Sequence, residues 1–263
     1  MRYNNPNGDD VKKFVATGIL WALGLVSMMS SVGASTPATL AGLSAAQVLN
    51  TSLKAANAQQ SATTLSSVKI LGSNNSPIFD VRVVATSGPQ SGYRFETIQG
   101  ARDEIIYADG VAYGKFDAAL IKVNFGSTDK TLANKWISFT KGNKFYNYLS
   151  SGNTLPSVLQ GIHPSGILKL TAPTTINGVS VIGVTGKMNV PTVTVSGPTV
   201  PVNGIETLFV STTAPFLPKQ MLVEQLQAGV TATTVVSFKN WGRDTPFPAP
   251  KNFTPFAQTG LGS

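Results

Sequence analysis

The chain has 263 residues, of which 42% are apolar and only 12% are charged, about half the charged fraction usual in soluble proteins. This composition, with 25 glycines and 16 prolines, predicts one large, turn-rich globular domain and excludes a disordered chain. There is no cysteine, which excludes disulfides, zinc–thiolate sites, thiol nucleophiles and lipid attachment to cysteine.

The net charge is +8, from 20 basic against 12 acidic residues. An excess of basic residues favours anionic partners such as lipid headgroups or acidic wall polymers. No RNA-binding signature, zinc finger or basic helix accompanies the charge, so nucleic acid is not an expected partner.

Lys12 and Lys13 precede an uncharged apolar run from Phe14 to Met29, which is followed by small residues at 30–34. The run slightly exceeds the core of a signal peptide, about 7–15 residues, and is shorter than the about 20 residues that span a bilayer. We therefore predict that residues 1–34 are a signal peptide or, alternatively, an uncleaved membrane anchor. Either one places the rest of the chain outside the cytoplasm, in the periplasm or cell envelope.

A linker is expected at residues 35–43, a single domain at 44–250 and an extended proline-rich tail at 251–263. Ser44 is positioned as the N-cap of a helix over residues 45–60. The predicted apolar stripe of this helix consists of Leu43, Val48, Leu49 and Leu53.

Residues 68–116 alternate in polarity as β-strands do. Tyr93, Phe95 and Thr97 alternate with Arg94, Glu96 and Ile98. Asp109-Gly110 is a strong signal for a two-residue hairpin. The pattern predicts an antiparallel meander with one face in water and one apolar face.

Residues 117–170 mix short helical turns with large apolar side chains. Strands return after residue 173, with a second hairpin signal at Asn177-Gly178. Residues 191–204 contain three prolines and are expected to form an irregular excursion.

No constellation of residues indicates catalysis. His163 is the only histidine, so a catalytic triad or a histidine metal site has at most one imidazole. Asp103 and Glu104 stand beside Arg102, and we interpret them as a solvated strand edge. The sequence predicts neither an enzyme nor a metal or cofactor site.

We expect the insertion at residues 117–170 to supply a ligand-binding cavity, although plain core packing is the alternative for each of its apolar side chains. The residues expected to line the cavity are Trp136, Phe139, Phe145, Tyr148, Leu149, Leu155, Leu159, Ile162 and Leu168.

Lysines are frequent in the same segment. Those expected to contact headgroups or a membrane are Lys115, Lys122, Lys135, Lys141 and Lys144. Lysines beside amphipathic aromatic residues are typical of membrane interfaces. An ordinary solvated face is the alternative.

The order of elements resembles the LppX/LprG-type lipoproteins and the wider group of LolA and LolB lipoprotein-sorting factors. The segments that carry the resemblance are "DGVAYGKF", "KWISF", "NGVSVIGVTGK", "FLPKQMLVE" and "FKNWGRDTPFPAP". The resemblance implies an α+β fold in which a strongly curved antiparallel sheet, a half-barrel, wraps over helices and encloses an apolar cavity. The chain departs from the lipoproteins because no cysteine follows the apolar run.

The resemblance also implies that the protein binds acylated lipids or lipoproteins in that cavity and transports them across the cell envelope. We expect a monomer whose lysines dock on anionic membrane surfaces. A sensor or regulatory module of the same fold, held by an uncleaved N-terminal helix, is an alternative. A structural envelope protein with a filled core is another.

Overall fold

The computed structural model describes residues 39–72, 76–188, 204–227, 230–243 and 247–261. The predicted signal or anchor at 1–34, part of the linker, and most of the excursion at 191–204 lie outside the described residues. Within the described ranges, no helix combines the length and the apolar character needed to cross a bilayer.

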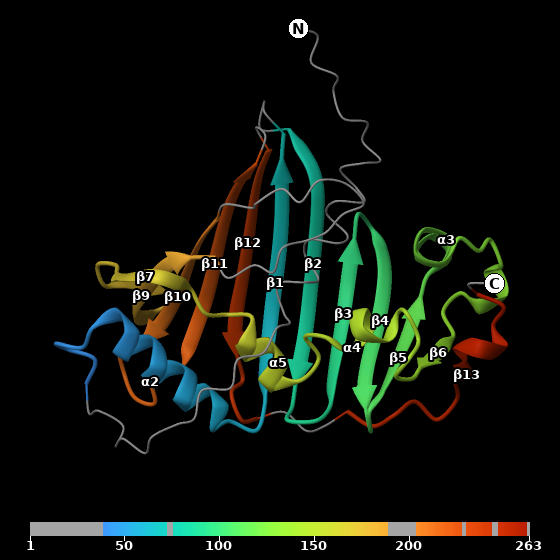
Figure 1. Cartoon of the computed structure of the whole chain (residues 1–263), viewed down its shortest axis with the longest axis horizontal. Helices are drawn as coiled ribbons and strands as arrows, with labels where there is room; N and C mark the ends of the chain where they lie inside the picture. The colour runs from blue at the N-terminus through green and yellow to red at the C-terminus, as the bar shows by residue number, and fades with distance from the viewer. Residues whose placement is uncertain (1–38, 73–75, 189–203, 228–229, 244–246, 262–263) are drawn as a thin grey trace, which may run out of the picture.

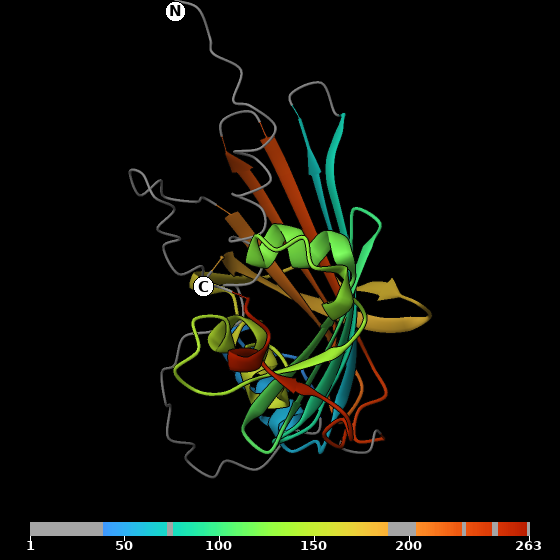
Figure 2. The same cartoon turned by 90° about the vertical axis from the view of Figure 1, so that its right-hand side faces the viewer.

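One large curved sheet forms the body of the protein (Figures 1 and 2). Its 13 described strands are β1 (Ala62–Leu71), β2 (Pro77–Ser87), β3 (Gly92–Ile98), β4 (Ala101–Ala108), β5 (Val111–Phe116), β6 (Trp136–Phe139), β7 (Ser165–Leu170), β8 (Thr174–Ile176), β9 (Val179–Lys187), β10 (Gly204–Ser211), β11 (Pro218–Gln227), β12 (Val230–Lys239) and β13 (Thr254–Pro255).

The strand order is β13-β6-β5-β4-β3-β2-β1-β12-β11-β10-β9-β7, and β8 pairs with β9. The pairs are antiparallel except β13 with β6, which is parallel. The two meanders, β1 to β6 and β9 to β12, meet where β1 pairs with β12. The sheet therefore stays open, with its edges at β13 and β7.

Short helices lie on one face of the sheet, which we call the inner face (Figure 1). They are α2 (Ala45–Asn57), α4 (Tyr146–Ser150) and α5 (Leu155–Gln160), while α3 (Ala118–Phe125) lies near β4 and β5 at the β6 end. Two 3-10 turns, η2 (Lys130–Leu132) and η3 (Phe256–Gln258), complete the elements of the described ranges. The predicted α+β fold, a curved sheet wrapped over helices, is confirmed.

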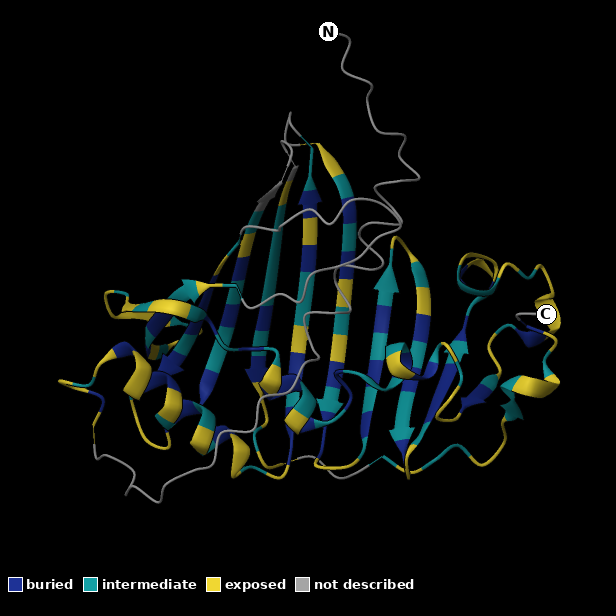
Figure 3. Ribbon diagram, viewed as in Figure 1, coloured by how far each residue is buried: buried dark blue, intermediate teal, exposed yellow. Residues whose placement is uncertain are grey.

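Helix α2 begins where the sequence predicts. Ser44 and Gln47 form a capping box, in which each side chain accepts a hydrogen bond from the other's backbone N–H; this satisfies two of the donors that a helix start leaves free. Val48 and Leu49 are buried against the sheet, whereas the opposite side of the helix is exposed (Figure 3). The helix ends at Asn57, before the predicted residue 60, because β1 begins at Ala62.

Both predicted hairpin turns are present. Asp109 and Gly110, and likewise Asn177 and Gly178, have positive φ angles at both positions, which is the conformation of a type I′ turn. These turns join β4 to β5 and β8 to β9.

The end of the chain differs from its prediction as a separate tail. Thr254 and Pro255 pair with Ile137 and Ser138 of β6. Phe256 packs among aromatic side chains, and Leu261 is buried. The boundary predicted at residue 250 therefore does not separate the described end of the chain from the domain.

Candidate functional site

The inner face carries three groups of buried apolar side chains. We call the first the aliphatic cluster; it joins α2 and α5 to strands β9 to β12 and includes Val48, Val184, Leu208 and Met221. Four of the residues predicted to line a cavity belong here. Leu155, Leu159 and Ile162 are buried in this cluster, and half-buried Leu168 packs against it.

The second group, the aromatic cluster, lies at the β6 end and joins β4, β5, β6, α3 and α4. Its rings come from Phe116, Phe125, Phe139, Phe145 and Phe256, with the ring centroids of Phe125 and Phe145 4.7 Å apart and those of Phe139 and Phe256 5.1 Å apart. Aromatic pairs in such geometries contribute about 0.5–1.5 kcal/mol beyond the area that they bury. The predicted residues Phe139 and Leu149 thus belong to this cluster, and Phe145 packs against it.

The third group, the β1–β2 cluster, consists of Val68, Ile70, Phe79 and Val81. Val68 pairs with Val81 and Ile70 with Phe79. They lie on the same face as Phe238 of the aliphatic cluster, because Thr64 pairs with Phe238 and every second residue of β1 faces the same way. The three clusters line much of the inner face with apolar side chains.

Trp136 lies on the opposite, outer face. It pairs with Lys115 in register, while its neighbour Ile137 is fully buried on the inner face. The ammonium group of Lys115 lies 5.8 Å from the centre of the Trp136 ring and 2.8 Å from a carboxylate oxygen of Glu104. The prediction that Trp136 lines an inner cavity is not compatible with this placement, which follows from the pairing of β6 with β5.

Between the aliphatic and aromatic clusters lies a group of charged residues that we call the polar cluster: Arg94 and Glu96 of β3, and Asp103 of β4. Their exposed fractions are 3%, 5% and 1%. The interpretation of Asp103 as part of a solvated edge is wrong, because Asp103 pairs with Glu96 in register and lies beneath α4. Arg94 and Glu96 likewise do not belong to the wet face of the meander.

The alternation of side chains along β2 and β3 contains a signal for the burial of the polar cluster. Val83 pairs with Glu96 and Ala85 with Arg94, so carrying the apolar face of β2 across the hairpin places both charged residues inside.

Tyr148 lies over the polar cluster. Burial, followed by the negative charge of Glu96, raises the pKa of Tyr148 far above its usual value. Its neighbour Tyr146 donates a hydrogen bond from its hydroxyl to the backbone oxygen of Gly110, over 3.0 Å. Burial and the nearby Tyr107 hydroxyl raise the pKa of Tyr146 to about 12, so both tyrosines remain neutral at physiological pH.

The predicted docking lysines separate into two groups. Lys115 is paired with Glu104 on the outer face. Lys122, Lys135, Lys141 and Lys144 are exposed, as is Lys130, and their segments lie at the β6 end of the sheet (Figures 1 and 2). Among the described residues, these five lysines have no carboxylate within ion-pair distance.

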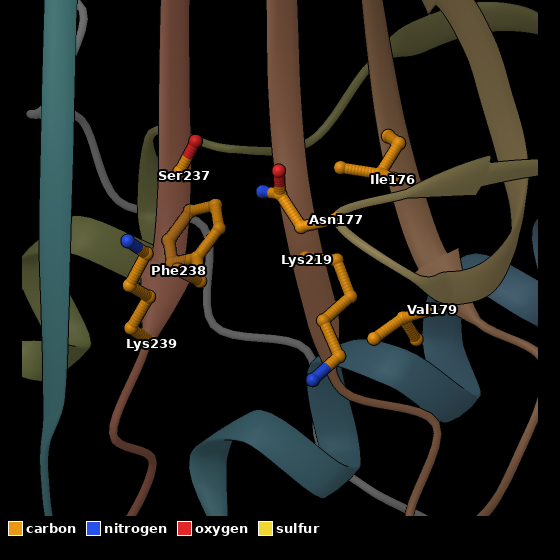
Figure 4. Close-up of a pocket in the computed structure, with 7 residues that line it drawn as sticks. All are labelled: Ile176, Asn177, Val179, Lys219, Ser237, Phe238 and Lys239. Atoms are coloured by element: carbon orange, nitrogen blue, oxygen red, sulfur yellow. The ribbon is translucent and has the colours of Figure 1, made fainter.

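A shallow pocket of about 180 Å³ lies between the β8–β9 turn and strands β11 and β12 (Figure 4). Lys219 and Lys239 both line it, but their ammonium groups do not converge on a common point. This pocket is smaller than the about 300–1,000 Å³ of most small-molecule sites. The enclosed apolar cavity predicted from the sequence stays a prediction.

The described residues hold no group of three or more histidine, aspartate or glutamate side chains that could bind a metal ion. His163 is half-buried in the segment between α5 and β7, and its Nδ1 atom has no hydrogen-bond partner within the described ranges. A lone imidazole in this position does not make a catalytic site.

No family model matches this chain, and no curated protein does. Several solved structures are similar to it. LprF from Mycobacterium bovis is 17% identical, with 78% of this chain and 96% of that chain covered and a TM-score of 0.47. The lipoprotein LppX from Mycobacterium tuberculosis is 11% identical, with 76% and 96% covered and a TM-score of 0.40. A LolA superfamily protein from Nitrosomonas europaea is also 11% identical, with 78% and 96% covered and a TM-score of 0.36.

The names of these structures are those of the groups that the sequence resembles. The predicted resemblance is therefore confirmed. The likeness is distant, and neither membership of a family nor a ligand is inferred from it.

Proposed function

We propose that this protein binds acylated lipids or lipoproteins on its inner face and carries them through an extracytoplasmic compartment. The observation that supports the proposal is the apolar lining of the inner face, which runs through three clusters beneath short helices. Eight of the nine residues predicted to line the cavity lie in or beside the aliphatic and aromatic clusters or over the polar cluster. The exception is Trp136.

The energetics explain why such a surface suits a carrier. Burying one methylene group stabilises by about 0.8 kcal/mol, so a C16 chain gains about 12 kcal/mol on leaving water. The same gain is available in a membrane. A protein surface of comparable apolar character therefore allows both loading and release, and it needs no catalytic group.

The cover over part of this face is suited to displacement. Helix α4 has five residues and α5 has six, whereas isolated helices shorter than about 12–15 residues are marginal in water. Both helices thus depend on their packing contacts with the rest of the protein. An acyl chain that replaces those contacts would take over the apolar surface that the helices now bury.

The exposed lysines at the β6 end support docking on an anionic membrane. Each basic residue near an anionic surface contributes about 1 kcal/mol of attraction, and Lys122, Lys130, Lys135, Lys141 and Lys144 are exposed beside α3 and α4. Val123, which follows Lys122 on α3, is 76% exposed and would enter the headgroup layer.

The test is native mass spectrometry with organic extraction of the full chain purified from its own envelope. We expect a stoichiometric acylated molecule.

Ser66 faces inward and Ser67 outward on β1, since Ser66 pairs with Val83 and Ser67 with Arg82. Ser66→Trp should reduce the bound lipid at least fivefold, whereas Ser67→Trp, its matched control, should leave it unchanged. Empty protein from repeated native preparations, with no uptake of added lipid, would overturn the proposal in favour of a sensor or structural role.

A further inference from the structure

The polar cluster brings three ionisable side chains together in the interior of the sheet's inner face. Arg94 Nε lies 2.6 Å from a carboxylate oxygen of Glu96. Glu96 and Asp103 are register partners on β3 and β4, so their side chains are neighbours on the same face. A positive charge thus lies among two carboxyl groups, in a place that water hardly reaches.

The cluster is short of hydrogen-bond partners. Arg94 donates one hydrogen bond, from Nη1 to the backbone oxygen of Ser151, over 3.0 Å. Among the described residues, Arg94 Nη2 and both carboxyl oxygens of Asp103 have none. Leaving a buried polar group without a partner costs about 1–3 kcal/mol, and more for a charged group. A second negative charge in this cluster would therefore be strongly unfavourable.

Asp103 avoids that cost by keeping a proton. Burial, and then the negative charge of Glu96, raise the pKa of Asp103 from its ordinary value of 3.8 to about 8. The guanidinium of Arg94 acts in the opposite direction, and the charges of Asp117 and Glu104 add smaller increases. With Asp103 protonated and Arg94 paired with Glu96, the polar cluster is neutral near pH 7.

The cover of the inner face is attached at this cluster. Tyr148 of α4 lies over Arg94, Glu96 and Asp103, whose charges all act on its hydroxyl. Ser151, which follows α4 directly, accepts the hydrogen bond from Arg94. The remaining described polar attachment of α4 to the sheet is through Tyr146, which contacts Gly110 and Tyr107.

We propose that Asp103 is a proton-binding site that holds α4 closed, and that loss of this proton releases α4 from the inner face. Deprotonation would place a net negative charge under Tyr148. Water must then enter to solvate the carboxylate, and the entry of water separates α4 from β3 and β4. The inference rests on the proposed function, because it names what opens the lipid-binding face. The opening itself needs no lipid.

The direction of the pH dependence follows from proton linkage. The closed form binds the proton up to about pH 8, whereas an open, solvated Asp103 has its ordinary pKa of about 3.9. Below that ordinary value both forms are protonated, and the closed form has its full stability. Between the two values the ratio of open to closed protein rises by up to tenfold per pH unit, and above about pH 8 it rises no further.

Two spin labels can measure the opening, because the chain has no cysteine of its own. One is placed at Asn147→Cys on the exposed side of α4, and the other at Lys69→Cys, which is exposed on β1. The full chain, freed of lipid, is examined by pulsed electron resonance between pH 5 and 9.5. We expect a second, longer distance whose fraction grows from pH 5 to 8 and then stays constant.

Asp103→Asn removes the ionisation and should give the short distance at every pH. Its matched control is Glu104→Gln, the next residue of the same strand on the outer face, which should keep the pH response and lower its upper end only slightly, because Glu104 is the smallest contributor to the raised pKa of Asp103. His163 is present in all variants, so a response that it caused would persist in Asp103→Asn.

If Asp103→Asn does not fold, Glu96→Gln serves instead: it removes the negative charge that raises the pKa of Asp103 most, and it should narrow the pH window from its upper end. A pH-independent distance in the unsubstituted chain, or an unchanged response in Asp103→Asn or in the substitute Glu96→Gln, would overturn the proposal. The spin-label experiment contains no lipid, so its failure would not contradict the carrier proposal. Conversely, a native preparation without bound lipid would not contradict the proton site at Asp103.

Discussion

The aliphatic and aromatic clusters cover opposite ends of one inner face, but they are assembled from the chain in different ways. The aliphatic cluster brings together α2, α5 and strands β9 to β12, which are distant in the sequence. The aromatic cluster comes mostly from residues 98–149 and is completed by Phe256 and Leu261 near the end of the chain. One end of the face is therefore integral to the sheet, whereas the other depends on short, local elements and on a late docking segment.

The difference indicates which end of the cover can move. Helix α2 has 13 residues, its own capping box and side chains buried in the aliphatic cluster, so it is held more firmly than the shorter helices. Helix α4 has five residues, and its N-cap residue Phe145 makes no side-chain cap hydrogen bond. We expect opening to begin at α4 over the aromatic cluster, with α2 on the aliphatic cluster as the fixed part.

The largest expected effect that tests this comparison is the loss of a ring from the aromatic cluster. Phe139 is fully buried, and Phe139→Ala should lower the free energy of unfolding by about 3–5 kcal/mol through lost burial and a cavity. Leu208→Ala, at a fully buried position of the aliphatic cluster, is the matched substitution, with an expected loss of about 2–5 kcal/mol.

Urea unfolding followed by tryptophan fluorescence distinguishes the two ends. Trp136 lies on β6, and Trp241 stacks on Phe238 of the aliphatic cluster with ring centroids 5.7 Å apart. With the other tryptophans replaced, Phe139→Ala should shift the Trp136 transition more than the Trp241 transition. Equal shifts would mean that the two ends unfold as one unit.

A smaller effect is expected where the α4–α5 connection lies on the sheet. A Cβ atom at Gly92 would overlap the backbone oxygen of Asn153, so Gly92→Ala must displace this connection. We expect a loss of about 1–3 kcal/mol, as for other overpacked sites, and faster hydrogen exchange of the amides in α4. Ser91→Ala, one residue earlier, should change stability by less than about 0.5 kcal/mol. Unchanged exchange in Gly92→Ala would show that the connection does not position α4.

The smallest effects concern the two helix caps. Ser44→Ala removes the cap of α2 in the aliphatic end, and Asp117→Ala that of α3 in the aromatic end; each should cost about 0.5–2 kcal/mol. Asp117 should cost more, because its carboxylate also accepts a hydrogen bond from the backbone of Arg102 on β4, over 2.9 Å. Thermal unfolding compares the two variants, and a larger loss for Ser44→Ala would contradict the assignment of Asp117 as a link between α3 and the sheet.

Features with local causes were predictable from the sequence. The Ser44 cap, the Asp109-Gly110 and Asn177-Gly178 turns and the two meanders each depend on a few neighbouring residues. The burial of the apolar residues in the insertion was predictable as well, because large side chains dense in sequence must be covered somewhere.

Features that depend on pairing across the sheet were not predictable from single segments. Strand β3 has Tyr93 and Phe95 on one face and the charged Arg94 and Glu96 on the other, so its own polarity pattern predicts burial of the wrong face. Only its register with β2 and the cover by α4 decide that the second face is buried. Trp136 faces outward for the same reason, since β6 takes its orientation from β5.

The open sheet has two edges, and each discourages addition of a foreign strand. At one edge, β13 consists of two residues, and Pro255 has no N–H to offer. At the other, β7 has an irregular register between Ser165 and Lys169 and carries the exposed ammonium group of Lys169. Short strands, prolines, irregularities and lysines at edges are the devices that prevent sheets from aggregating edge to edge. A sheet with this much unclosed β-structure is therefore guarded at both of its ends against pairing with the sheet of another molecule.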